Sequence, residues 1–160
     1  DVAEFENLVA SDRLLVQGRG DDSNRVTAYN LDSGEQVWEA DSGQMLGANV
    51  STLLTWMAED SETVTAIRLD DGEELFEFDI EGEALSAIGS ATVYSLRIDS
   101  SVATARAISL DDGAELWEVD LDVPDGSLND LVMEFSGDRM WVRFAGQEDG
   151  RQFATMVPFL

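Results

Sequence analysis

Short runs of apolar and polar residues follow one another along the whole chain, and they predict β-strands. In one group, Met45–Val50 is short and apolar, Leu53–Ala58 is almost continuously apolar, and Thr63–Leu69 and Glu73–Ile80 alternate apolar with polar positions. Period-two alternation is typical of a half-buried strand, and polar turns separate the runs. No convincing amphipathic stretch reaches helix length. The pattern therefore predicts an all-β protein built from groups of four short strands.

An internal repeat organises these groups. A glycine recurs with an aromatic residue four positions after it and an alanine six positions before it. The repeated residues are Ala28, Gly34, Trp38, Ala66, Gly72, Phe76, Ala107, Gly113 and Trp117. A β-sandwich would not require each group to restart with the same spacing, so the repeat favours a β-propeller. We expect four blades, at residues 7–41, 45–80, 84–122 and 128–160.

The fourth copy is incomplete. SDRLLV at Ser11–Val16 returns as GDRMWV at Gly137–Val142, but Leu160 stands where Gly34 would recur. We therefore expect the last blade to lack its outer strand. One hypothesis is that the four blades are the C-terminal half of a larger ring and that an upstream segment supplies the missing strand. The alternative is that two copies assemble to complete a ring.

The repeated residues have predictable structural roles. Glycine at the end of the Leu-Asp-Asp/Ser-Gly turn can adopt positive φ and sets the register of the fourth strand on the third. The aromatic residue is then expected to pack against the next blade and hold the two blades together. The small alanine is expected to leave space for this ring or for the neighbouring blade. Acidic residues occupy the other face of the fourth strand: Glu39, Asp41, Glu77, Asp79, Glu118 and Asp120. We expect them to protect an exposed sheet edge, with a metal site as the alternative.

The charge balance is strongly acidic and limits the possible partners. The chain has 34 acidic and 9 basic residues, a net charge of −25, and all nine basic residues are arginine. Such a surface repels phosphate backbones and anionic lipid, so we expect no binding to nucleic acid or to membrane surfaces. We also expect no membrane insertion, because no apolar run is long enough to span a membrane. A salt-loving organism would explain the acidity, since salt screens the repulsion. An arginine-biased, high-GC bacterium is the alternative.

The missing residue types exclude most catalytic chemistry. The chain has no Cys, His or Lys, which removes thiol and imidazole catalysis, zinc–thiolate sites and Schiff-base formation. Carboxylate pairs could serve glycoside hydrolysis, but with 34 acids such pairs are inevitable. Trp56 and Trp141 fall in apolar second strands and are expected in the core.

One acidic run resembles a calcium-binding loop. It contains Asp120, Asp122 and Asp125, followed by Gly126. Pro124 displaces the third ligand position that such a loop requires. A solvated loop is therefore the expected structure, and calcium the weaker alternative.

The repeated segments AYNLDSGEQVW, AIRLDDGEELF and AISLDDGAELW resemble the tryptophan-docking repeat of the PQQ-like (quinoprotein, BamB-like) eight-bladed propellers. Members of that superfamily are quinoprotein dehydrogenases, which bind pyrroloquinoline quinone and calcium, or non-catalytic scaffolds outside the cytoplasm. This chain departs from the pattern. The basic residue that is common after the glycine is replaced by Glu35, Glu73 and Ala114. The chain has no Cys pair, and its length is about half that of the family's members.

These observations together predict a non-catalytic propeller scaffold that binds a protein or ligand outside the cytoplasm, without a cofactor. Its expected partner is another protein or the remainder of its own propeller. No apolar run approaches a membrane span, and the N-terminus lacks the features of a signal peptide, so any targeting segment is expected to have been removed or never present. The competing hypothesis is part of a quinoprotein-type enzyme or cofactor-binding propeller whose catalytic residues lie outside this chain.

Overall fold

The computed structural model describes residues 5–18, 25–56, 63–80, 84–99, 102–122, 130–136, 139–145 and 152–158. Within these ranges every regular element is a β-strand, and none is a helix of the length and apolarity that crossing a membrane requires. The strands form four antiparallel sheets in chain order, three with four strands and one with three.

Each sheet is a meander in which consecutive strands pair. The first contains β1 (Phe5–Ala10), β2 (Arg13–Gly18), β3 (Arg25–Asn30) and β4 (Gln36–Asp41). The second contains β5 (Gln44–Ala48), β6 (Thr52–Trp56), β7 (Thr63–Arg68) and β8 (Glu74–Asp79). The third contains β9 (Ala84–Ile88), β10 (Thr92–Asp99), β11 (Val102–Ser109) and β12 (Glu115–Asp122). The last contains β13 (Asp130–Ser136), β14 (Arg139–Ala145) and β15 (Gln152–Pro158).

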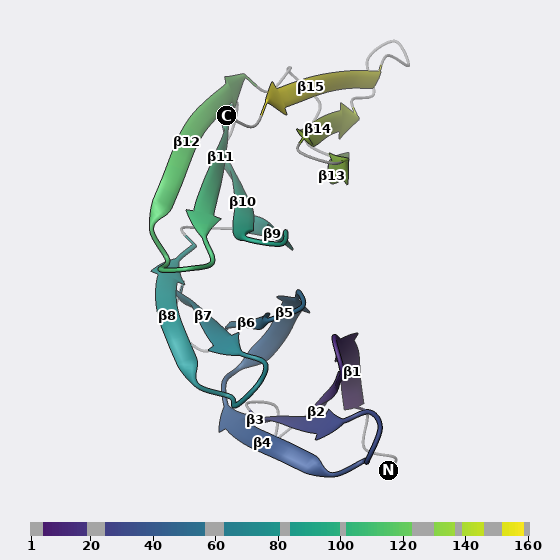
Figure 1. Ribbon diagram of the computed structural model, residues 1–160. Coiled ribbons are helices and arrows are strands. Elements are labelled where there is room, and N and C mark those ends of the chain that lie inside the picture. The colour runs from purple at the N-terminus through teal and green to yellow at the C-terminus, as the bar shows by residue number, and fades with distance from the viewer. Residues whose placement is uncertain are drawn as a thin grey trace.

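The four sheets stand side by side along an open arc (Figure 1). The first strands, β1, β5, β9 and β13, lie on the concave side of the arc, and β4, β8 and β12 lie on the convex side. This is the radial order of propeller blades, so we call the sheets blades 1 to 4. The predicted all-β propeller fold is confirmed, and the described part of blade 4 has three strands where blades 1 to 3 have four.

The repeated glycines close the hairpins between the third and fourth strands. Gly34, Gly72 and Gly113 have φ of +70°, +77° and +74°, a conformation that favours glycine. In blade 2 the N–H of Gly72 donates to the carbonyl of Arg68 at 2.9 Å, and a β-bulge follows Ala66 in the pairing of β7 with β8. The other two hairpins repeat the bond and the bulge. The turn therefore fixes where each aromatic residue lies on its outer strand.

Aspartates in these turns bind backbone N–H groups. The Oδ1 atom of Asp71 accepts from the N–H of Glu73 at 3.0 Å, and this bond lowers the pKa of the Asp71 carboxyl. Hydrogen bonds from the Ser109 hydroxyl and the Ala114 N–H likewise lower the pKa of Asp112. In blades 2 and 3 the aspartate before the glycine thus helps to stabilise the turn, whereas in blade 1 the Oδ1 atom of Asn30 accepts from the N–H groups of Asp32 and Ser33.

The hydrophobic core lies between neighbouring blades. In one cluster, Trp38 and Ala28 of blade 1 pack against Leu53, Ile67 and Leu69 of blade 2. A second cluster joins blades 2 and 3 and contains Leu54, Val64, Ala66, Phe78, Ile80, Val93, Ile108 and Leu110. Full burial of such a side chain contributes about 1.5–3 kcal/mol, so the contacts between blades stabilise the arc.

Two amide side chains add polar links on the concave side. Gln17 is buried; its Nε2 donates to the carbonyl of Gly43 at 2.6 Å and its Oε1 accepts from the N–H of Met45 at 2.9 Å. Asn49 donates to the carbonyl of Gly89 at 2.9 Å. Each link joins one blade to the beginning of the next, so the blades are held at both their outer and inner ends.

Candidate functional site

The aromatic residue of blade 1 docks on the glycine turn of blade 2. Trp38 is 7% exposed, and a Cβ added at Gly72 would lie 2.8 Å from its Cδ2 atom. The indole N–H donates to the carbonyl of Leu69 at 2.7 Å. The absence of a side chain at Gly72 therefore serves close approach of the indole as well as the turn.

Blades 2 and 3 repeat this contact without its hydrogen bond. A Cβ at Gly113 would lie 2.6 Å from the Cδ2 atom of Phe76. The phenyl ring has no donor for the carbonyl of Leu110, which is the counterpart of Leu69. The structure thus brings two of the three repeated aromatic residues against repeated glycines across blade boundaries, Trp38 at Gly72 and Phe76 at Gly113.

We expect Phe76→Trp to stabilise the chain by about 1 kcal/mol, the contribution of one hydrogen bond. The new indole N–H would reach the carbonyl of Leu110, as Trp38 reaches Leu69. Equilibrium unfolding by denaturant measures the change, with Phe76→Leu as a control that keeps an apolar side chain but no ring. A loss of stability in Phe76→Trp would show that the two docking sites are not equivalent.

The third aromatic residue, Trp117, is half-buried on β12. Its ring lies 6.3 Å from that of Tyr94, centroid to centroid, with the planes tilted by 39°. The side chains of blade 4 lie outside the described residues. Trp56 ends β6 half-buried and packs against the cluster between blades 2 and 3, as expected of a core residue.

The repeated acids form cross-strand pairs with the third strand of their own blade. Thr104 donates from its hydroxyl to Asp120 at 2.8 Å, and Thr65 donates to Glu77 at 3.4 Å. Arg25 lies 3.5 Å from Glu39 and 3.4 Å from Asp41. Hydrogen bonds and ion pairs to the third strand therefore position these acidic side chains. Their expected role in protecting the sheet edge remains a prediction.

No described group of three or more acidic, His or Cys side chains could hold a metal ion. Of the calcium candidates, Asp120 is paired with Thr104. The side chain of Asp122 and the whole of Asp125 lie outside the described residues, so the calcium alternative is untested there.

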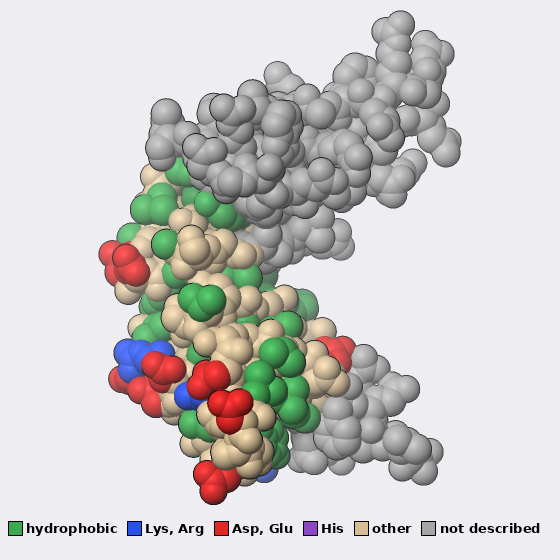
Figure 2. Space-filling model, turned by 45° about the vertical axis from the view of Figure 1, so that its right-hand side comes forward, with side chains coloured by type: hydrophobic (Ala, Val, Ile, Leu, Met, Phe, Trp, Pro, Cys, Tyr) green, Lys and Arg blue, Asp and Glu red, His purple; other side chains and the backbone are tan. Residues whose placement is uncertain are grey.

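Arginines and acids lie next to one another on the surface that Figure 2 shows. One such group occupies the β7–β8 turn, where Arg68 is paired with Asp71 at 3.0 Å and also with Glu73.

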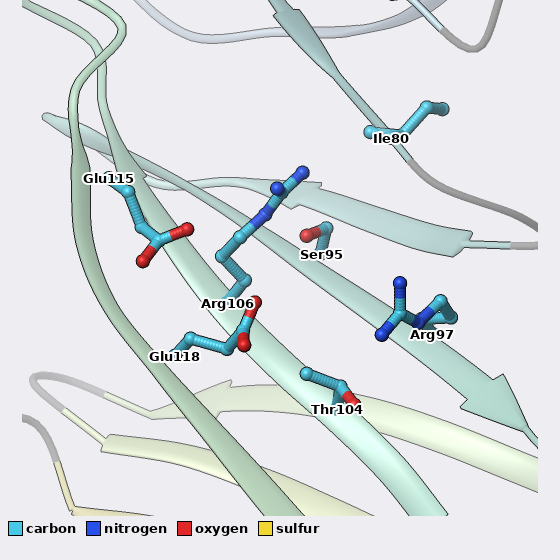
Figure 3. A pocket seen from close by; sticks show the side chains of 7 residues that line it. All are labelled: Ile80, Ser95, Arg97, Thr104, Arg106, Glu115 and Glu118. Carbon is cyan, nitrogen blue, oxygen red and sulfur yellow. The ribbon is translucent and has the colours of Figure 1, made fainter.

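Two arginines line a polar groove of about 360 Å³ on blade 3, at its boundary with blade 2 (Figure 3). The lining residues are Ile80, Ser95, Arg97, Thr104, Arg106, Glu115 and Glu118. Ser95, Thr104 and Ile80 are buried, the arginines are half-buried, and the glutamates are exposed. We call this the polar groove.

Strand register explains why these side chains share one face. Ser95 pairs with Arg106 and Arg106 pairs with Glu118, while Arg97 pairs with Thr104. Residues two apart on a strand face the same side of the sheet. The side chains of these two sets of paired residues therefore all point toward blade 2. The guanidinium of Arg106 also donates to the backbone carbonyl of Asp79, which ties blade 3 to the end of β8.

The polar groove is suited to recognition. It presents guanidinium donors and hydroxyls beside carboxylate acceptors, so it offers both donors and acceptors of hydrogen bonds. Ser95 has no His or Lys available as a general base, because the chain contains neither. Sequence reasoning missed this groove. The available signal was arginine at positions 97 and 106, within strands whose neighbouring positions are mostly small or apolar.

Solved structures share the propeller architecture at low sequence identity. The WD40 domain of Toxoplasma gondii coronin matches with a TM-score of 0.62 and 9% identity, over 99% of this chain and 46% of that one. Kluyveromyces lactis Hsv2 matches with a TM-score of 0.56 and 8% identity, over 94% and 50%. BamB from Moraxella catarrhalis matches with a TM-score of 0.45 and 15% identity, over 95% and 60%. The chain thus spans about half of the length of these proteins.

No curated protein matches the sequence significantly. The sequence profile of one family, described as outer membrane protein assembly factor BamB, matches residues 22–154. That match covers most of the chain and includes all three copies of the docking motif, so the chain belongs to this BamB-like family of PQQ-type propellers.

Proposed function

We propose that the chain is a non-catalytic propeller scaffold that binds a protein partner, and that the polar groove is part of the recognition surface. The observation that carries the proposal is the groove itself, where two arginines and two glutamates line one opening between blades. The family supports it, since an assembly factor acts through contacts with other proteins. The lack of Cys, His and Lys supports a non-enzymatic role.

The chemistry of the groove suggests what it binds. Arg97 and Arg106 can donate to backbone carbonyls of an extended segment, and Glu115 and Glu118 can pair with its basic side chain. The net charge of −25 attracts a cationic partner and repels an acidic one. The proposed ligand is therefore an exposed polypeptide segment of a partner protein that carries lysine or arginine.

A library of arginine-containing peptides tests this assignment by fluorescence anisotropy at ~0.15 M salt, where charged groups at the surface still attract one another. We expect the double variant Glu115→Gln/Glu118→Gln to weaken binding of the selected peptide at least ~10-fold, since it removes both carboxylate partners. The matched control is Asp32→Asn/Glu35→Gln, which makes the same change of charge at exposed positions in the blade 1 turn.

Two outcomes would contradict the proposal. Equal weakening in both double variants would mean that only the net charge attracts the peptide. If none of the basic peptides bound, the groove would not be a recognition site. The competing enzyme hypothesis places the catalytic residues outside this chain, so it is tested by titrating the product of the complete reading frame with pyrroloquinoline quinone, followed by absorbance. We expect no saturable spectral change.

We further propose that the protein works outside the cytoplasm. The supporting observation is the family description, which names the outer membrane. Fractionation of cells that express the complete reading frame tests the location, and recovery with cytoplasmic markers would contradict it.

A further inference from the structure

An arginine in the third strand distinguishes the polar groove from the same face of blades 1 and 2. Strand register places Thr27 of blade 1 and Thr65 of blade 2 at the position of Arg106, since each precedes the repeated alanine of its strand. Each of the three pairs with an acidic residue of the outer strand, in turn Glu39, Glu77 and Glu118. The acids therefore belong to the repeat, whereas a guanidinium at this position is particular to blade 3 among these three blades.

Arg97 adds a second guanidinium to the same face. It pairs with Thr104, and Arg106 lies two residues from Thr104 on β11, so the two arginines are diagonal neighbours. The Cα atoms of such neighbours are about 7–8 Å apart, which is within reach of long side chains. At the position of Arg97, the second strand of blade 1 ends in Gly18, which has no side chain.

A buried hydroxyl lies between the two guanidinium groups (Figure 3). Ser95 is 5% exposed, pairs with Arg106 and precedes Arg97 by two residues on β10, so its side chain shares their face. Two positive charges side by side repel each other, and an anion between them offsets that repulsion. A carboxylate suits this place, because guanidinium groups bind it through paired N–H donors and a hydroxyl supplies a further donor.

The charges of the polar groove are ordered across the blade. The strand order is β12, β11, β10, so Glu118 and Arg97 lie two strands apart, with Arg106 on the strand between them. Neighbouring strands are about 4.8 Å apart, which separates the acidic and the basic end by about 10 Å at the backbone. Glu115 extends the acidic end on β12. A ligand that fills the groove therefore meets carboxylates toward the convex side of the arc and guanidinium groups toward the concave side.

We propose that the polar groove recognises two opposite charges in one polypeptide segment. Glu115 and Glu118 bind its basic side chain, and Arg97, Arg106 and Ser95 bind a carboxylate. In an extended segment, residues two apart face the same side and are about 7 Å apart, and long side chains span the remaining distance to the two ends of the groove. The preferred ligand is an extended segment in which Asp or Glu stands two positions from Lys or Arg. This inference rests on the proposed function, because it names the feature by which the groove selects its peptide.

Matched synthetic peptides test this selection. The arginine-containing peptide that binds most tightly is made again with glutamate two positions before the arginine, or two positions after it, and each version has a twin with glutamine at that position. In one of the two orders, we expect the glutamate peptide to bind at least ~10-fold more tightly than its twin, as hydrogen bonds between charged groups allow. Fluorescence anisotropy at ~0.15 M salt measures both dissociation constants.

Arg97→Gln should remove this preference or reverse it, because the net charge of −25 then repels the peptide carboxylate. The ratio of two dissociation constants measured on one variant does not depend on the fraction of folded protein, so partial unfolding cannot imitate the result. Arg25→Gln is the matched control. Arg25 lies on the corresponding face of blade 1, where it is paired with Glu39 and Asp41, and its replacement should leave the preference unchanged.

The outcomes separate this inference from the proposed function. Suppose that the glutamate and glutamine peptides bind equally in both orders, while binding still depends on Glu115 and Glu118. The selection of a carboxylate would then be refuted and the recognition of a basic segment would stand. A preference for glutamate that survives Arg97→Gln would also overturn the inference, since another group would then hold the carboxylate. If no arginine-containing peptide bound, the proposed function would fail, and this inference with it.

Discussion

Replacing Trp38 by alanine is expected to lower the free energy of unfolding by about 3–5 kcal/mol, the usual effect of removing a buried large aromatic side chain. The indole is 7% exposed, packs on Gly72 and belongs to the cluster that joins blades 1 and 2. Its loss leaves a cavity at the blade boundary and also leaves the Leu69 carbonyl without its donor. Denaturant unfolding in molar salt, monitored by circular dichroism, measures the effect.

Trp38→Phe separates packing from hydrogen bonding. The phenyl ring keeps most of the contact with Gly72, so we expect a loss of only about 1 kcal/mol, that of the indole hydrogen bond. Phe76 shows that the site accepts a phenyl ring on a glycine turn. Equal losses in Trp38→Ala and Trp38→Phe would mean that packing on the glycine contributes little.

Gly72→Ala is the second large expected effect, a loss of about 3 kcal/mol. The positive φ of +77° adds about 1–2 kcal/mol for any side chain, and the contact of the new Cβ with the Trp38 ring adds a further ~1–3 kcal/mol for overpacking. The same unfolding experiment measures it in the 160-residue chain.

Gly34→Ala is the matched control. Its φ of +70° is nearly the same, but the new Cβ would meet nothing within 4 Å. We expect only the backbone contribution, about 1–2 kcal/mol. If both substitutions lowered stability equally in this chain, the ring contact at Gly72 would be refuted. In a longer chain whose preceding blade covers Gly34, the two substitutions should become equally unfavourable.

The repeat made the contacts between blades predictable. Gly34, Gly72 and Gly113 each precede an aromatic position by four residues, and three copies of one spacing point to a shared structural role. The alternation of apolar residues predicted the strands, although individual ends moved by one or two residues, such as Met45–Val50 against β5 at Gln44–Ala48. Strand ends depend on turn hydrogen bonds, which alternation does not encode.

The polar groove could not be predicted in the same way. Its formation requires Arg97 and Arg106 to face blade 2, and this depends on the register of β10 against β11 and on the packing of two blades. The partners of the repeated acids were missed for a related reason, since Thr104 and Asp120 become neighbours only through the pairing of β11 with β12. The bulge after Ala107 changes that register by one residue along part of the hairpin.

The central claim is that the aromatic residue of each blade packs on the glycine turn of the next, and a double-mutant cycle between Trp38→Leu and Gly72→Ala tests it most directly. The smaller leucine leaves room for the new Cβ, so the loss caused by Gly72→Ala should shrink by at least ~1 kcal/mol in that background, while a cycle with the distant Gly113→Ala should be additive. Additivity within about 0.5 kcal/mol at Gly72 would contradict the claim.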